Sequence, residues 1–319
     1  MDGTRRVRGW LGVLACVVWC QAGCAWLPRP PAQQPGPPVL PPSPSLPQII
    51  EAVNRNSSGI QSFSTNQATL SGQGFPTLRA SVAFERPQRF RLLADTAFTG
   101  AEVDLGSNDE LFWMWVRRNQ PAAFLFCRHD QFTNSPARQM IPVEPAWLIE
   151  ALGVAEFDPA LPHQGPYPMP NGQLQVRTVR EMPEGPTTKI TILDARRALV
   201  LAQHVYDHRG QLAASAVAQG HRRDPLSGLI MPRVVDVSCP AAQLALRIDL
   251  GNVTINSLQG DRTELFTMPS YDGWPMVDLG DPNFQVPQTA PSRLPPAQLP
   301  PRVSTRIRSP LRPGNRLVR

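Results

Sequence analysis

Three observations predict a mainly β protein with about ten or eleven strands and two helices. Apolar and polar residues alternate with period two at residues 78–85 and 89–95, as in strands with one buried face. Residues 111–116 are apolar on both faces, so we expect an apolar layer on each side of the sheet there. Short turn-like joins connect the later strand-like runs, so neighbouring strands should pair as antiparallel hairpins.

The elements follow one another in a simple order. A helix is predicted at residues 45–59, because Ser45 is a capping residue, Pro47 lies in the first turn and Gly59 follows the apolar stripe. Two weak strands within residues 60–73 lead into four strands between residues 78 and 127. A second helix at 144–153 and a proline-rich loop at 158–171 precede six more strands, at 174–179, 187–193, 199–206, 212–218, 232–237 and 244–250.

Proline separates one folded domain from two flanking segments. Of the 37 prolines, ten lie between Pro28 and Pro47 and nine between Pro282 and Pro313. Both segments lack periodic apolar residues, so we expect extended linkers or disordered chain there. The predicted organisation is a signal sequence at 1–24, a proline-rich tether at 25–46, one globular domain at 47–280 and an arginine- and proline-rich tail at 281–319.

The basic charge belongs to the ends of the chain. The net charge is +6; residues 1–24 contribute +2, and residues 282–319 contribute +7 through seven arginines without an acid. Residues 25–281 therefore carry −3, and this slightly acidic domain argues against nucleic acid as a partner. The tail either contacts anionic lipid or another anionic envelope polymer, or it is a solvated end without a partner.

The amino terminus has the organisation of an export signal. A basic segment precedes an apolar run, residues 9–19, that is too short for an ordinary membrane span. Small residues then precede Cys24, an order that resembles the signal peptide of bacterial lipoproteins, whose cysteine is diacylated and becomes the first residue. The resemblance implies a lipid anchor at Cys24 and, because Ala25 follows it, the periplasmic face of the outer membrane. The alternative is a cleaved secretory signal without lipid.

Catalytic and metal-binding patterns are missing from the sequence. There is no nucleophile elbow, zinc-protease motif or phosphate loop, and the five histidines show no metal-ligand pairing. We therefore expect no catalytic residue, no metal and no cofactor. Only Cys127 and Cys239 remain in the exported domain, and they form either a disulfide or two isolated buried thiols.

Three motifs occur in a fixed order after the leading helix. They are FERPQRFR at residues 84–91, DELFWMW at 109–115 and ELFTMPSYDG at 264–273. This order resembles the lipoprotein-localisation (LolA/LolB-like) superfamily and its lipid-carrying relatives, over most of residues 48–279. The resemblance implies an antiparallel sheet curled into an incomplete barrel, with helices over its concave face. It also implies that Arg86 lies near the lid of a cavity.

In such a half-barrel, aromatic residues of the central strands would line an apolar ligand cavity beneath a helical lid. Alternatively, they only fill a core between sheet and helices. Arg86 either hydrogen-bonds the lid or an acyl ester, or it is an ordinary arginine of an edge turn. The cavity candidates are Phe84, Phe90, Trp113, Trp115, Phe124 and Phe126, with Trp147 and Leu148 as the lid.

The sequence therefore predicts a lipid-anchored envelope protein rather than an enzyme. Its predicted activity is to bind or transfer acyl chains or lipoproteins through an apolar half-barrel cavity. Binding would follow from the removal of apolar surface from water, at roughly 25 cal/mol per Å². The alternative is a structural or sensor lipoprotein with a filled core, which acts through its surface and its tail.

Overall fold

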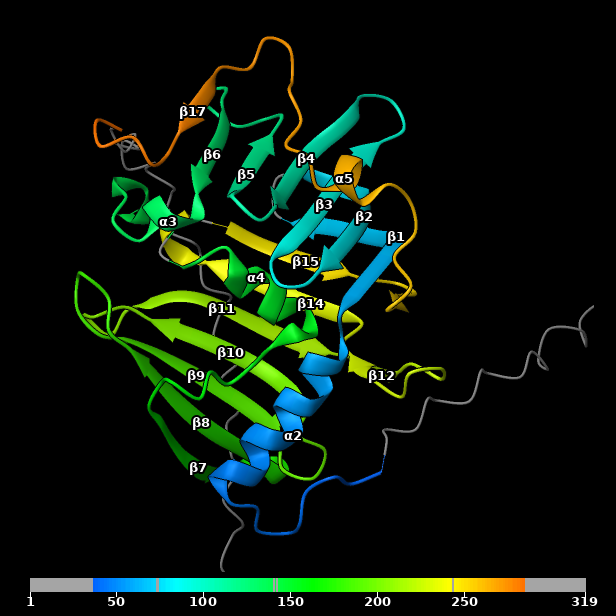
Figure 1. The fold of residues 1–319 in the computed structure, drawn as a ribbon, viewed down its shortest axis with the longest axis vertical. Coiled ribbons are helices and arrows are strands. Elements are labelled where there is room, and N and C mark those ends of the chain that lie inside the picture. Colours follow the sequence, from blue (N-terminus) through cyan, green and yellow to red (C-terminus); the bar gives the residue numbers. More distant parts are fainter. Residues whose placement is uncertain (1–36, 73–74, 140, 142, 243, 285–319) are drawn as a thin grey trace, which may run out of the picture. The chain divides into compact units, whose positions relative to one another are not determined.

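Figure 1 shows the protein as a computed structural model, in which the described residues are 37–72, 75–139, 141, 143–242 and 244–284. One helix and six strands form the first half of the described chain. They are α2 (Leu46–Gly59), β1 (Ser62–Gly72), β2 (Phe75–Glu85), β3 (Arg89–Thr96), β4 (Gly100–Ser107), β5 (Leu111–Val116) and β6 (Phe124–Arg128).

Short helical turns occupy the centre of the chain: α3 (His129–Phe132), η2 (Pro136–Gln139), α4 (Ala146–Ile149) and the π-helical turn η3 (Glu150–Val154). The second half is again mostly strands. They are β7 (His163–Met169), β8 (Gln173–Arg180), β9 (Thr187–Asp194), β10 (Val200–Tyr206), β11 (Leu212–Gln219), β12 (Arg222–Arg223), β13 (Ile230–Met231), β14 (Val234–Cys239), β15 (Leu244–Asp249), β16 (Thr254–Ile255) and β17 (Met276–Asp278), interrupted by η4 (Pro170–Gly172), η5 (Pro240–Ala242) and α5 (Arg262–Leu265).

Fifteen of the described strands form one sheet. Its order from end to end is β17-β6-β5-β4-β3-β2-β1-β15-β14-β11-β10-β9-β8-β7, and β16 pairs with β1 beside it. Among these pairs only β17 with β6 is parallel. Within the described residues the end strands β7 and β17 do not pair with each other, so the sheet stays open. The predicted fold class, a mainly β protein with an antiparallel sheet that does not close, is confirmed.

The leading helix begins where the capping pattern predicts. The side-chain oxygen of Gln48 accepts a hydrogen bond from the backbone N–H of Ser45 at 2.9 Å, the reciprocal half of a capping box. The second predicted helix is present as α4 followed by η3. Residues 62–72 form one long strand with a bulge between Thr65 and Ala68, and not the two weak strands that their polarity predicted.

Six of the described strands were not predicted from the sequence: the short β12, β13, β16 and β17, of two or three residues each, and the longer β4 and β7. Strand β4 carries Glu102 and Asp104, which read as turn or surface residues, yet both are buried and paired with arginines of neighbouring segments. Strand β7 lies within the predicted proline-rich loop at 158–171. It is the end strand of the sheet, and a proline is tolerated at such an edge because its missing N–H need not bond a neighbour.

Helix α2 and the α4–η3 segment lie over one side of the sheet, which we call the helix face (Figure 1). Helix α2 packs Ile49 and Val53 on side chains of β8 and β9. The α4–η3 segment packs Trp147 and Leu152 on side chains of β1–β3, β11, β14 and β15. The helix face is therefore the side on which both buried clusters meet the sheet.

Residues 262–278, which we call the C-terminal segment, run over the opposite side of strands β3–β6 and end in β17 beside β6. We call this side the outer face. Met268, Tyr271 and Trp274 pack there against Trp113 and other aromatic residues of β5 and β6. The intervening residues of β5, Phe112 and Met114, point to the helix face. The predicted apolar layer on each side of residues 111–116 is thus confirmed. None of the described helices has the length and apolar character needed to cross a bilayer.

Candidate functional site

The structure does not bring the predicted cavity residues together in one place. Because neighbours along a strand point to opposite faces, the eight side chains divide into two groups. Phe84, Phe90, Trp147 and Leu148 belong to the main cluster of the helix face. Trp113, Trp115, Phe124 and Phe126 belong to the outer-face cluster under the C-terminal segment.

The helix-face group is packed within the main cluster of that face. Phe84 and Phe90 are 0% and 3% exposed, and the ring of Phe84 lies 5.4 Å from that of Phe63. Trp147, the predicted lid residue, is 7% exposed in the same cluster. The part of the helix face beneath α4 therefore resembles a filled core. The role of these residues in binding a ligand stays a prediction.

The outer-face group is held by a buried carboxylate. Asp104 is fully buried and accepts hydrogen bonds from Arg91 Nη2 at 2.8 Å, Trp113 Nε1 at 3.1 Å and the Tyr271 hydroxyl at 2.7 Å. Burial, and then the bond to Asp104, raise the pKa of Tyr271, so its hydroxyl remains a donor. The Tyr271 ring stacks on Trp115 at 3.9 Å. These contacts fix the C-terminal segment to the sheet.

Arg86 binds the carboxyl end of helix α2. Its Nε donates to the Ile60 carbonyl at 2.9 Å, and its Nη2 donates to the Ser57 carbonyl and to Glu156 Oε1, the latter at 2.7 Å. The guanidinium thus satisfies carbonyls that the end of a helix leaves unpaired. These partners do not include the predicted lid residues Trp147 and Leu148, so both alternatives for Arg86 stay predictions.

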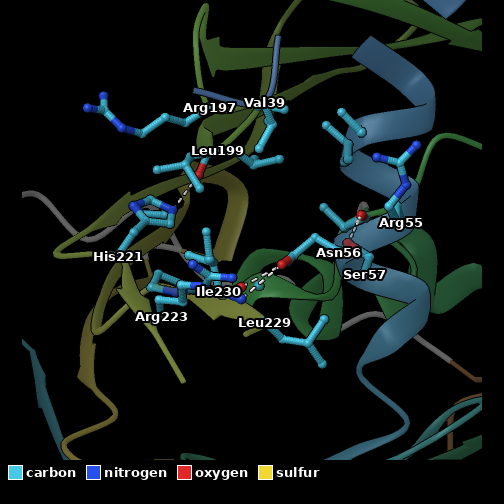
Figure 2. A pocket seen from close by; sticks show the side chains of 18 of the residues that line it. Val39, Arg55, Asn56, Ser57, Arg197, Leu199, His221, Arg223, Leu229 and Ile230 are labelled. Atoms are coloured by element: carbon cyan, nitrogen blue, oxygen red, sulfur yellow. Dashed lines mark hydrogen bonds between the residues drawn. The ribbon is translucent and has the colours of Figure 1, made fainter. Parts of the chain in front are cut away.

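A pocket of about 250 Å³ opens between α2, η3 and the β12–β13 hairpin (Figure 2). Its apolar wall comes from five stretches of the chain, within residues 37–39, 52–53, 151–155, 198–200 and 218–232. Gly153 lies in this wall with φ of +118°, and a Cβ there would lie 2.6 Å from Pro232 Cδ, so the close approach requires glycine. The apolar lining residues are Pro37, Val39, Ala52, Val53, Ala151, Ala155, Ala198, Leu199, Val200, Ala218, Leu229, Ile230 and Pro232.

The polar side chains in the wall are already bonded to the protein. Asn56 forms two hydrogen bonds to the backbone of Ile230, at 2.9 and 2.8 Å, and so joins α2 to the hairpin (Figure 2). Ser57 donates to the Ala155 carbonyl. His221 Nε2 lies 3.0 Å from the Val200 carbonyl. Because these groups have partners, the pocket mainly offers a ligand apolar contact.

The pocket also has a cationic border. Arg55, Arg197 and Arg223 line it, and Figure 2 shows their side chains extending from three different segments. Arg55 pairs with Glu51, Arg197 with Asp194, and Arg223 donates to the Gly228 carbonyl. Glu150 is the one carboxylate among the lining residues, and it is paired with Lys189. The border therefore favours an anionic over a cationic group.

None of these pocket residues was singled out by the sequence analysis. Asn54, Asn56 and Ser57 follow one another on α2 and read as a solvated helix face, but all three bond to distant segments. Their clustering in the second half of the helix was the available signal, because small polar residues are poor helix formers that often make local or tertiary hydrogen bonds. His221 offered no signal in the sequence.

Burial makes His221 sensitive to pH. Desolvation is the largest cause that lowers the pKa of this imidazole below its usual 6.5. As pH falls through the value of the unfolded chain, about 6.5, the unfolded chain binds a proton before the folded chain does, so stability should fall. The loss is at most about 1.4 kcal/mol per pH unit. We expect His221→Gln to lose less stability than the wild type between pH 7.5 and 5.0 in urea unfolding.

The control is His208→Gln, in an exposed turn, which should keep the acid sensitivity of the wild type. His204 also has a pKa lowered by burial, and its contribution is common to all three proteins. Equal pH dependence of the His221→Gln variant and the wild type would contradict the expectation.

The cysteines of the domain are separate thiols. Cys127 and Cys239 are both free and buried, in different clusters. Burial, and then the charges of Asp278 and Asp130, raise the pKa of Cys127 to about 11. Within the described residues no three His, Cys, Asp or Glu side chains come together as metal ligands would. Cys24 and the arginines of the tail lie outside the described residues.

No family model matches this chain, and no curated protein matches it. Similar solved structures include a DUF1329 family protein from Desulfovibrio piger, with 12% identity, 68% of this chain and 96% of that chain covered, and a TM-score of 0.45. A LolA superfamily protein from Nitrosomonas europaea has 10% identity, 69% and 97% coverage, and a TM-score of 0.44.

A third similar structure is an outer membrane lipoprotein-sorting protein domain from Vibrio parahaemolyticus, with 9% identity, 67% and 94% coverage, and a TM-score of 0.43. One of these three structures is itself described as a LolA superfamily protein. At these identities and TM-scores the likeness concerns the fold and says nothing about a ligand.

Proposed function

We propose that this protein binds the apolar part of an amphiphile, a single acyl chain, in the pocket between α2 and the β12–β13 hairpin. The observation that supports it is the mainly apolar wall of this pocket. The polar residues in the wall, Asn56, Ser57 and His221, are hydrogen-bonded to the protein itself. A ligand there gains little from hydrogen bonds and much from leaving water. Arg55, Arg197 and Arg223 at the border suit an acidic headgroup.

The size of the pocket limits the ligand. A volume of about 250 Å³ is slightly below the roughly 300–1,000 Å³ of typical ligand sites. At about 30 Å³ for each water-sized group, it holds roughly eight methylenes. The several long chains of a lipoprotein anchor would not fit without an opening of the helix face, so one chain is the better match.

The same estimate sets the expected affinity. Burial of roughly eight methylenes, at about 0.8 kcal/mol each, contributes about 6 kcal/mol. Ordering of the chain and loss of its free motion oppose binding. The dissociation constant should therefore be no tighter than roughly 10 µM.

Titration calorimetry of the full chain with decanoate, in the absence of detergent, tests the proposal. We expect saturable binding, with an affinity for octyl glucoside, whose headgroup is uncharged, within about tenfold of that for decanoate. Ala52→Trp places an indole in the pocket and should weaken decanoate at least tenfold, because the chain and the indole compete for one volume.

The matched control is Ser58→Trp, which adds the same side chain at an exposed position of α2 outside the pocket. It should bind decanoate as the wild type does. Decanoate that binds equally to the wild type and to a folded Ala52→Trp variant would show that the pocket is not the site.

The second candidate function is that of a structural or sensor protein that acts through its surface. The observation in its favour is the filled core beneath α4, where Trp147 and Leu152 occupy the helix face. Under this alternative, the wild type and Ala52→Trp would both fold normally and neither would bind decanoate or octyl glucoside.

We also propose that the domain is held at the periplasmic face of the outer membrane by acyl chains on Cys24. The support is the signal-like order of residues 1–24 and the proline-rich tether that follows. Two chains on one residue bury enough methylenes for stable anchoring. Mass spectrometry of the mature amino terminus distinguishes a lipidated Cys24 from a cleaved, unmodified end.

A further inference from the structure

A second, smaller pocket lies on the other side of the α4–η3 segment. It has a volume of about 90 Å³ and lies between α4, η2 and strands β8 and β9. Glu150 is the one residue that it shares with the larger pocket. The apolar part of its lining is Val143, Leu161, Met182 and Val205.

Two buried side chains in this pocket have donors for which the described residues provide no hydrogen-bond partner. The side chain of Arg138 is 8% exposed, and its Nε and Nη1 make no hydrogen bond. Arg138 forms an ion pair with Glu184, whose Oε1 lies 3.4 Å from Nε outside hydrogen-bond geometry and whose side chain is about half exposed. Trp147 is 7% exposed, and its Nε1 has no acceptor. An unpaired buried donor is rare in proteins, because its desolvation is not compensated.

The chemistry of these groups defines what they can bind. Arginine and the indole N–H only donate, and arginine keeps its charge at any physiological pH. The other cations of the lining, Arg180 and Lys189, are already paired with Glu144 and Glu150, each at 2.6 Å. The pocket therefore lacks one acceptor group, and the charge of Arg138 favours an anionic one. About 90 Å³ equals roughly three water molecules, which is enough for a carboxylate or a phosphate group.

We propose that Arg138 and Trp147 form a binding site for a small oxyanion, a carboxylate or a phosphate group, in the pocket between α4 and strands β8 and β9. The oxyanion accepts from the guanidinium and from the indole N–H. Because both donors are buried, these charge-assisted bonds are stronger than they would be at the surface. The site is independent of acyl-chain binding in the larger pocket.

Calorimetry and thermal unfolding of the full chain with inorganic phosphate or acetate, at constant ionic strength, test the proposal. An anion that binds the folded state raises the melting temperature of the wild type. Trp147→Phe removes one donor and keeps the packing, and it should weaken the anion about tenfold, the loss expected for one charge-assisted hydrogen bond. Arg138→Met should abolish the effect of the anion. Arg177→Gln, on the exposed side of β8 and outside the pocket, should leave it unchanged.

Two further arms distinguish the source of the anion. Flotation with phosphatidylglycerol vesicles, compared with phosphatidylcholine vesicles, shows whether a lipid headgroup reaches Arg138; Arg138-dependent flotation supports the site with a headgroup as its ligand. Binding of phosphate or acetate without vesicle binding supports it with a soluble anion. The inference is overturned if phosphate, acetate and both kinds of vesicle act on the wild type as they act on Arg138→Met and on Trp147→Phe. The pocket would then hold only water. Ala52→Trp should keep anion binding, so failure of the larger pocket is recognised separately.

Discussion

Replacement of Asp104 with alanine is expected to destabilise the protein by about 3–5 kcal/mol, the range for breaking a buried, hydrogen-bonded charge pair. Asp104 is fully buried and accepts hydrogen bonds from Arg91, Trp113 and Tyr271. Without it, a mostly buried guanidinium, the buried indole N–H of Trp113 and the half-buried hydroxyl of Tyr271 lose their acceptor at once. The midpoint of urea unfolding measures the loss.

The same variant should also loosen the C-terminal segment. Limited proteolysis is expected to cut residues 262–278 of Asp104→Ala faster than those of the wild type, because Tyr271 has lost its bond to the sheet. Asp236→Ala is the matched control: Asp236 pairs with Arg247 at 3.0 Å, but both side chains are substantially exposed, so its removal should cost below about 1 kcal/mol. A similar small loss for Asp104→Ala would refute the central role given to this carboxylate.

Replacement of Arg86 with alanine is expected to cost about 2–3 kcal/mol, since hydrogen bonds to charged groups contribute roughly 1.5–3 kcal/mol each and water can replace part of them. The side chain is 24% exposed and holds the Ser57 and Ile60 carbonyls together with Glu156. Arg86→Lys should not restore the loss, because one ammonium group cannot reproduce the planar arrangement of donors. Hydrogen exchange should become faster in α2 before it does so in the sheet.

Arg89 provides the control on the same turn. It pairs with Asp109, where both side chains are at least one-third exposed, and with Glu85, which keeps Arg262 as a second partner. Arg89→Ala should therefore cost below about 1 kcal/mol and leave exchange in α2 unchanged. If the two arginine variants behaved alike in urea and in exchange, Arg86 would be an ordinary turn arginine, the other alternative that the sequence allowed.

Local patterns were sufficient for most of the secondary structure. The alternation at residues 78–85 and 89–95 predicted β2 and β3, and Ser45 with Gly59 marked the ends of α2. Strand β4 was not predicted, because an aspartate such as Asp104 is usually a surface residue. Its burial depends on Arg91, on the neighbouring strand β3, with which it pairs. Propensity is a property of a single residue, whereas a carboxylate can be buried only where partners compensate the cost of removing its charge from water.

The packing partners of the aromatic residues also could not be predicted from local sequence patterns. The pattern of 111–116 required apolar layers on both sides of the sheet, but it could not say which segment supplies each layer. The structure assigns one layer to the α3–η2 region and the other to the C-terminal segment. The predicted cavity required Phe84 and Trp113 to lie on the same face of the sheet. The sequence could not show that they lie on opposite faces.

The sequence by itself determined the class of fold, most of the longer strands and the ends of the leading helix, because these depend on residues a few positions apart. Only the tertiary structure decided where the pockets lie and which polar groups are left without partners. Asp104 and Tyr271 are 167 residues apart, and Asn56 and Ile230 are 174 apart. Such pairs form only when the whole sheet has brought them together, so no local period encodes them.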